Sequence, residues 1–327
     1  MEIGSFIELQ LPKGREWYKG DQNIARLNTG RMGIWHAFRV TGCKRIWVPV
    51  YQCDSIRKTL LDKGVEVCYY YQDEHFNPIG IEAVEDDAVL LVNYYGIMSS
   101  KRMEELSKPY KYPIIDCAQA FFCKPIDNSQ MVYSCRKFVG VPDGAYVLGN
   151  NAHKFIVDYP ECCSSDTANF LLMRLEYGCE GKSYAARSMN EHRIDNEDCM
   201  LMSKLTRTIL DAEDYDFNKK KRVENFMYAQ KLFGGINKID PTEYFDEGTI
   251  PMVYPLVVED DHLLHVLQTH KHFQGHWWSY ICEEQSQDCF EHWISRYMIP
   301  ITIDQRYGKE ELDYLSSIIH NYLNNER

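Results

Sequence analysis

The 327-residue chain lacks the patterns of several common protein classes. Its formal net charge of -12 argues against a broad basic face for nucleic acid, because such faces hold phosphates through many Lys and Arg contacts. No apolar run approaches the roughly 20 residues that span a bilayer. The opening MEIGSFIELQ has neither the basic start nor the apolar stretch of a signal peptide, so we expect a cytoplasmic protein.

Familiar catalytic and metal motifs are also missing. The absence of GxxxxGK[ST], GxGxxG, HExxH and GxSxG removes support for a kinase, a Rossmann dehydrogenase, a zinc protease or a serine hydrolase. The twelve cysteines include no CxxC pair, which favours reduced thiols over zinc ligands or disulfides. Gly275 interrupts the helical register of the nearby His272 and His276, and no carboxylates complete a site, so we expect no metal.

Strand-like and helix-like segments alternate through the first half of the chain. Continuous apolar or β-branched runs predict strands at 45–50, 65–71, 88–95, 112–116, 131–135 and 144–149. Helical spacing predicts helices at 31–41, 55–63 and 100–108. This alternation predicts an α/β fold with a mostly parallel sheet that is covered on both faces.

The second half of the chain is mostly helical in its predicted pattern. Residues 165–235 have helical spacing, and a polar stretch at 211–221 predicts a boundary between a large domain, 1–214, and a small α+β domain, 215–327. In the small domain we expect strands at 252–258 and near 277–281, with helices at 262–270 and 309–323. The basic run 219–222 follows three acidic residues and is interpreted as a solvated helix start.

The chemistry of the chain centres on residues 112–149. Asp116 ends one predicted strand and Ser134 lies near the end of another, with Lys137 three residues later. Ligands of parallel sheets bind at the carboxyl ends of strands, so these side chains are expected to share a crevice. A lysine, a carboxylate and phosphate donors are the groups that an enzyme using pyridoxal phosphate (PLP) needs: the amine binds the cofactor, and the carboxylate keeps its ring nitrogen protonated.

Four blocks resemble the DegT/DnrJ/EryC1/StrS sugar aminotransferases. They are NTGRM (28–32), NYYG (93–96), IIDCAQAF (114–121) and KFVGVPDGA (137–145), in the family's order and rough spacing over residues 25–150. The resemblance implies the PLP-dependent transferase fold type I, with a mostly parallel seven-stranded sheet, helices on both faces and a smaller α+β C-terminal domain. It also implies PLP as the cofactor, with these residues binding it: Thr29, Gly30, Arg31, Cys53, Tyr95, Asp116, Gln119, Ser134 and Lys137.

Within this set, Lys137 would be the Schiff-base lysine and Asp116 the partner of the ring nitrogen. Gln119 would lie on the ring-hydroxyl side of the cofactor. The chain also departs from the family pattern: Arg31 replaces a threonine, Cys53 stands where an aromatic ring often stacks on PLP, and Ala145 replaces a glycine. Ser134 lies closer to the lysine than usual, and the segment before the phosphate turn is short. Tyr51 or Tyr95 are alternatives for the missing ring.

Each assignment has a simpler alternative. Lys137 would ordinarily be a solvated loop residue, Asp116 a helix cap, and Thr29 with Gly30 an ordinary helix start. A buried carboxylate preceded by two isoleucines needs a partner, however, and a pyridinium or an arginine would serve.

The resemblance implies a homodimeric aminotransferase that moves an amino group from glutamate to a keto sugar nucleotide, in polysaccharide or related biosynthesis. Alternatives are a catalytically lapsed accessory or regulatory protein with this fold, or another PLP reaction such as sugar dehydration. All the PLP hypotheses require the Lys137 side chain to lie near the Asp116 carboxylate. They fail if it points into open water far from that group.

Overall fold

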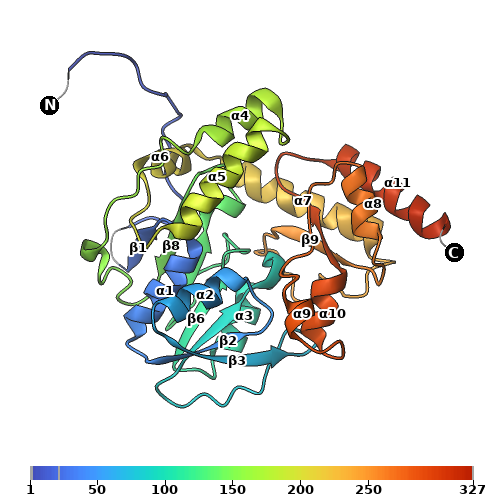
Figure 1. The fold of residues 1–327 in the computed structure, drawn as a ribbon, viewed down its shortest axis with the longest axis horizontal. Coiled ribbons are helices and arrows are strands. Elements are labelled where there is room, and N and C mark those ends of the chain that lie inside the picture. The colour runs from blue at the N-terminus through green and yellow to red at the C-terminus, as the bar shows by residue number, and fades with distance from the viewer. Residues whose placement is uncertain (1–2, 21–22, 326–327) are drawn as a thin grey trace.

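The computed structural model describes residues 3–20 and 23–325 and is built around one large sheet (Figure 1). The strands lie in the order β1-β8-β7-β6-β5-β2-β3-β4. Neighbouring strands are parallel from β3 through β2, β5 and β6 to β7, whereas β8 pairs antiparallel with both β7 and β1. The bounds are β1 Ile24–Leu27, β2 Arg45–Pro49, β3 Glu66–Gln72, β4 Pro78–Ile79, β5 Ala88–Val92, β6 Tyr112–Cys117, β7 Gln130–Ser134 and β8 Ala145–Leu148.

The central strands are buried on both faces, as their continuous apolar runs predict. In β5, Leu90 packs into one hydrophobic cluster and Leu91 into the other, and Ile114 and Ile115 divide in the same way on β6. The first cluster includes residues of helices α1 (Gly30–Thr41) and α2 (Asp54–Asp62). The mostly parallel α/β fold is therefore confirmed. The two-residue antiparallel β4 extends the expected seven strands to eight.

Further helices surround this sheet. α3 (Ser100–Ser107) lies in the predicted place, while α4 (Asn169–Tyr177), α5 (Lys182–Asn196) and α6 (Lys204–Ala212) occupy the predicted helical region. The C-terminal part lies on the right of Figure 1 and contains α7 (Tyr215–Phe233), α8 (Leu263–Thr269), α9 (Ile281–Glu284), α10 (Phe290–Tyr297) and α11 (Lys309–Asn325). Its small sheet pairs β9 (Val253–Val257) with β10 (Met298–Thr302) antiparallel. The domain boundary after residue 214 stays a prediction.

Two expectations for this region are wrong. The predicted strand near 277–281 is a turn followed by α9. Trp278 has a φ of 60°, and the two tryptophan rings pack against Tyr51 and Tyr95, which follow β2 and β5. The basic run 219–222 is only partly solvated, because Arg222 is 2% exposed inside α7.

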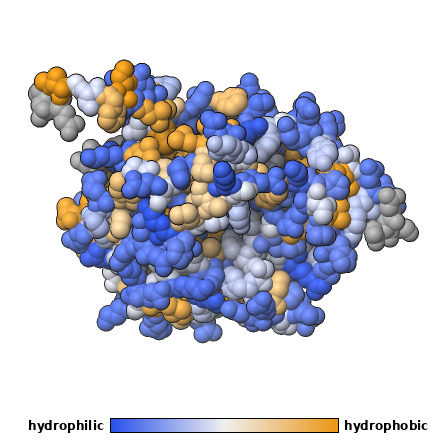
Figure 2. Space-filling model, turned by 45° about the horizontal axis from the view of Figure 1, so that its top comes forward, coloured by the Kyte–Doolittle hydropathy of each residue, from blue (hydrophilic) through white to orange (hydrophobic). Residues whose placement is uncertain are grey.

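Apolar side chains are exposed at one end of the molecule. The N-terminal segment extends from the body in Figure 1, and Figure 2 shows hydrophobic residues on it and beside it. Ile3, Phe6 and Ile7 are each more than four-fifths exposed, and Leu175 of α4 is equally open. No helix within the described ranges is long and apolar enough to cross a membrane.

Candidate functional site

The carboxyl ends of β5, β6 and β7 bring the predicted site residues to one edge of the sheet. Val92 at the end of β5 is in register with Asp116 of β6, and Asp116 is in register with Val132 of β7. The chain leaves β5 through the turn η1 (Tyr94–Gly96) and leaves β7 through the turn η2 (Cys135–Lys137). The η1 turn with its tyrosines, the Asp116 carboxylate and the η2 turn with Lys137 therefore lie at the ends of three adjacent strands, on the same edge of the sheet.

Asp116 is a buried carboxylate with one free oxygen. It is 5% exposed, and its Oδ1 accepts a hydrogen bond from the Ala118 backbone N–H at 2.8 Å. No described residue donates a hydrogen bond to Oδ2. Burial raises the pKa of the Asp116 carboxyl, while the charge of Lys137 and the Ala118 N–H act in the opposite direction.

Lys137 ends the η2 turn and is exposed in the isolated chain. Its ammonium lies near enough to Asp116 to lower the pKa of that carboxyl. Within residues 3–20 and 23–325 it forms no ion pair or hydrogen bond with that carboxylate. The two groups thus lie near each other without direct contact, and the amine is accessible from solvent.

The start of α1 lies beside Ser134. Thr29 caps the helix through its Oγ1, which accepts the Met32 N–H at 3.3 Å. A Cβ built on Gly30 would lie 3.7 Å from the Cβ of Ser134, so the helix N-terminus and the Ser134 side chain adjoin. The first N–H groups of a helix have no intrahelical partner, and together with a hydroxyl they suit an anion such as phosphate.

Two predicted cofactor contacts have other partners in this chain. The Arg31 guanidinium forms an ion pair with Asp195 of α5, which leaves its backbone N–H at the start of α1. Cys53 precedes α2, and its Sγ lies 3.1 Å from the hydroxyl of Ser55. Neither side chain supplies an aromatic face to the strand-end site.

Tyr95 and Gln119 hold each other in place. The Gln119 Oε1 accepts the Tyr95 N–H at 2.6 Å, which fixes a residue whose φ is 57°. The Tyr95 hydroxyl lies 2.6 Å from that of Tyr51, and both rings are fully buried. Gly96 must lack a side chain, because a Cβ there would lie 2.2 Å from the Gln119 carbonyl oxygen.

Sequence reasoning missed two features near this edge. Gln52 follows the end of β2 at 2% exposure, and neither of its amide atoms has a hydrogen-bond partner among the described residues. Trp277 and Trp278 pack on Tyr95 and Tyr51 with ring centroids 5.7 and 4.6 Å apart. The strand-end position of Gln52 was a weak signal, whereas nothing local predicted the tryptophan contacts.

The turn after Lys137 is anchored by Asp143. This fully buried carboxylate accepts the Ser203 backbone N–H at 3.0 Å and the Ser203 hydroxyl at 2.6 Å, and it also accepts the Ser164 hydroxyl. The next residue, Gly144, has a φ of 119°, and a Cβ there would meet the Thr206 methyl at 2.8 Å. The Pro-Asp-Gly sequence thus fixes the loop that follows the lysine.

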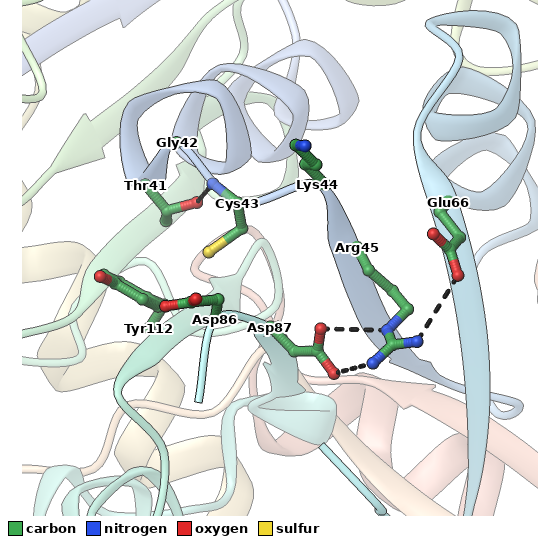
Figure 3. Close-up of a pocket in the computed structure, with 9 residues that line it drawn as sticks. All are labelled: Thr41, Gly42, Cys43, Lys44, Arg45, Glu66, Asp86, Asp87 and Tyr112. Carbon is green, nitrogen blue, oxygen red and sulfur yellow. Dashed lines mark hydrogen bonds and ion pairs between the residues drawn. The ribbon is translucent and has the colours of Figure 1, made fainter. Parts of the chain in front are cut away.

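A separate surface pocket lies at the opposite end of the strands (Figure 3). It has a volume of about 390 Å³, and its lining includes Arg45, Glu66 and Tyr112, which begin β2, β3 and β6. Within it, Arg45 forms ion pairs with Asp87 at 2.9 Å and with Glu66 at 3.6 Å. Ligands of parallel sheets bind at the carboxyl ends, and the candidate site is therefore the edge with Asp116.

No family model and no curated protein matches this chain. Its structure is similar to that of a DegT/DnrJ/EryC1/StrS aminotransferase from Brucella abortus, with a TM-score of 0.61 at 12% identity, covering 91% of this chain and 85% of that one. The comparison with the sugar aminotransferase CalS13 from Micromonospora echinospora has a TM-score of 0.62 at 14% identity and covers 91% of this chain and 86% of that one. The comparison with NtdA from Bacillus subtilis, which has bound cofactor PMP, has a TM-score of 0.62 at 11% identity and covers 91% of this chain and 72% of that one.

These likenesses show the fold. The chain has the type I fold of PLP-dependent transferases, and its structural neighbours include sugar aminotransferases of the family that the four sequence blocks resemble. At 11–14% identity, activity and substrate do not follow from the likeness.

Proposed function

We propose that the chain is a PLP-dependent aminotransferase with Lys137 and Asp116 as its catalytic residues. The observation that carries the proposal is the arrangement at the edge of the sheet. A buried carboxylate with a free oxygen lies near an accessible lysine, beside a helix N-terminus. No other site in the described part of the chain combines these three groups at the carboxyl ends of parallel strands.

The side chains present fit the cofactor. The Oδ2 of Asp116 accepts no hydrogen bond from the described residues, and a protonated pyridine nitrogen would be a suitable donor to it. Thr29, Gly30, Arg31 and Ser134 would hold the phosphate, through the first N–H groups of α1 and the Ser134 hydroxyl. Gln119 and the fixed Tyr95 turn would border the ring, with Cys53 as a small neighbour in place of an aromatic residue.

The chemistry then divides between the cofactor and the chain. When bound, pyridoxal phosphate supplies a ring that accepts electrons from the substrate carbon. The Lys137 amine holds the cofactor and moves a proton at its Nζ atom. The Asp116 carboxyl would face the ring nitrogen, and the N-terminus of α1 would hold the phosphate end, so that the reacting atoms would stay in reach of Lys137.

By resemblance, the amino donor would be glutamate and the acceptor a keto sugar nucleotide, in polysaccharide or related biosynthesis. We propose a cytoplasmic homodimer. All twelve cysteines are free, in keeping with a reducing compartment. The exposed apolar residues of the N-terminal segment and α4 are the kind of surface that a second copy would cover.

Chemical trapping on the lysine tests the proposal. The protein is incubated with PLP, reduced with borohydride and digested, and the mass of the peptide that contains residue 137 is measured. We expect a pyridoxyl group on Lys137 and none in Lys137→Ala, and we expect glutamate to discharge the visible absorption of the bound cofactor. An unlabelled Lys137 in folded wild-type protein would refute the proposal.

One observation favours an accessory role as the second candidate. Cys53 and Arg31 replace two family residues, and both side chains have partners outside the proposed cofactor site. A lapsed enzyme would accept the label on Lys137 but would not respond to glutamate. Another PLP reaction, such as sugar dehydration, would also leave the cofactor unchanged by glutamate but would turn over a sugar nucleotide.

A further inference from the structure

Arg222 is a buried cation that no described carboxylate contacts directly, although the charges of Asp304 and Glu213 are near enough to raise its pKa. It lies in α7 at 2% exposure and forms no ion pair with the described acidic residues. Burial lowers its pKa to about 10, which still leaves the guanidinium charged at neutral pH. Burying a guanidinium costs the free energy of its lost hydration, so the groups that Arg222 contacts should show what the residue stabilises.

On one side, Arg222 contacts the lysine turn. Its guanidinium carbon lies 4.4 Å from the ring centroid of Phe138, the residue after Lys137. Its Nε donates to the Asn218 Oδ1 at 2.8 Å, and the amide of Asn218 donates to the Phe138 carbonyl at 3.0 Å. Gln305 donates to that same carbonyl at 3.0 Å. Three side chains from the C-terminal part of the chain thus hold Phe138 from its ring and its backbone.

On the other side, Arg222 reaches the tyrosine turn through the backbone. Its Nη1 donates to the Met252 carbonyl at 3.0 Å. The Met252 N–H donates to the Tyr95 carbonyl at 2.8 Å, and the Tyr95 N–H donates to the Gln119 Oε1 at 2.6 Å. Hydrogen bonds joined through the backbone of Met252 and Tyr95 therefore connect Arg222 to a predicted cofactor contact.

We propose that Arg222 is a positioning residue that holds the η2 turn, which ends at Lys137, in place relative to the η1 turn, which contains Tyr95. The inference rests on the proposed function, because it gives the Lys137 amine its fixed place relative to the cofactor. The cation–ring contact and the carbonyl contacts use both the plane and the edge of the guanidinium. The cost of burying the charge is offset by contacts that tie the two turns together.

Two ligands separate positioning from general loosening. PLP reacts with Lys137, whereas 4-deoxypyridoxine 5′-phosphate has no aldehyde and binds without that bond. In Arg222→Met we expect covalent capture of PLP, measured by borohydride trapping over time, to slow by about tenfold or more, because small misplacements of reacting groups have effects of this size. The affinity for the deoxy analogue should change by less than about threefold, which corresponds to under about 0.7 kcal/mol. Arg222→Lys should recover part of the rate.

The control is Lys220→Met, on the same helix, whose side chain is 76% exposed and which should behave as wild type. Equal weakening of both ligands in Arg222→Met would overturn the positioning role, and so would an unchanged capture rate. If Arg222→Met does not fold, Asn218→Ala takes its place, because it removes the bonds to Arg222 and Phe138; an unchanged rate there overturns the proposal. If PLP does not label Lys137 in the wild-type protein, the proposed function is refuted as well. If wild type is labelled and Arg222→Met captures PLP at the wild-type rate, only the positioning role is refuted.

Discussion

Replacing His272 with phenylalanine should reduce the acid sensitivity of this fold. His272 is 7% exposed, and neither ring nitrogen has a hydrogen-bond partner among the described residues. Burial lowers its pKa to about 4, because the charged imidazolium would lose its hydration without gaining a partner.

The direction of the effect follows from the protons bound in each state. An unfolded histidine titrates near 6.5, so between that pH and about pH 4 the unfolded chain binds a proton that the folded chain excludes. The stabilising contribution of the neutral ring is therefore complete above pH 6.5 and is lost as the pH falls toward 4. Each pKa unit is worth about 1.4 kcal/mol, so the fall from 6.5 to about 4 amounts to about 3 kcal/mol.

The assay is urea unfolding of wild type and His272→Phe at several pH values. From about pH 7.5 to about pH 4.5, wild type should lose roughly 2–3 kcal/mol more of its free energy of unfolding than the variant does. His265→Asn, an exposed histidine on α8, is the control and should follow wild type. The change in side-chain volume adds a difference in the free energy of unfolding that is the same at every pH. If wild type and His272→Phe differ only by such a constant, so that their curves against pH are parallel, the reasoning is refuted.

Three further substitutions test the scaffold of the site. Gly33→Ala should cost about 1–3 kcal/mol in urea unfolding, because the new Cβ would lie 2.8 Å from a valine methyl of β7; an unchanged midpoint would contradict the packing of α1. Asp143→Asn should destabilise by about 2–3 kcal/mol, since an amide NH₂ would face the donors of Ser203, and calorimetry should show a lower Tm. Glu284→Gln breaks the partly exposed pair with Arg57 between α9 and α2, and a loss above about 1 kcal/mol, or one insensitive to salt, would be unexpected.

The central strands were predictable because their signal is local. β5 and β6 are runs of apolar residues that end on polar ones, and both their position and the strand-end location of Asp116 follow from that pattern. β1 escaped prediction because four residues, Ile24–Leu27, are too few to show a period. β10 and α10 adjoin within a stretch of mixed aromatic, charged and β-branched residues, and no local cue separates them.

The two wrong structural predictions concern residues whose tertiary contacts outweigh the structure that the local sequence favours. The apolar, aromatic sequence near Trp277 resembles a strand, yet its rings pack on Tyr51 and Tyr95, and the backbone turns to allow it. Arg222 lies in a run of lysines that predicts exposure, but the aromatic face of Phe138 and two carbonyls lie on its side of α7. Both cases depend on residues far away in sequence, which composition and spacing do not reveal.

The pKa of Asp116 links the stability of the fold to its proposed chemistry. Burial raises the folded-state pKa, so ionising this carboxyl opposes folding: the related stability is complete below the unfolded pKa and is lost as the pH rises through the folded one. A cation placed against the free Oδ2 would lower that pKa and reverse the loss. A protonated pyridine nitrogen is such a cation, and Lys137 is a weaker one because it lies near without forming an ion pair. The strand-end carboxylate is therefore a position where ligand binding should stabilise the folded chain more at neutral pH than in acid, which is the behaviour expected of a residue kept for its ligand and not for the fold.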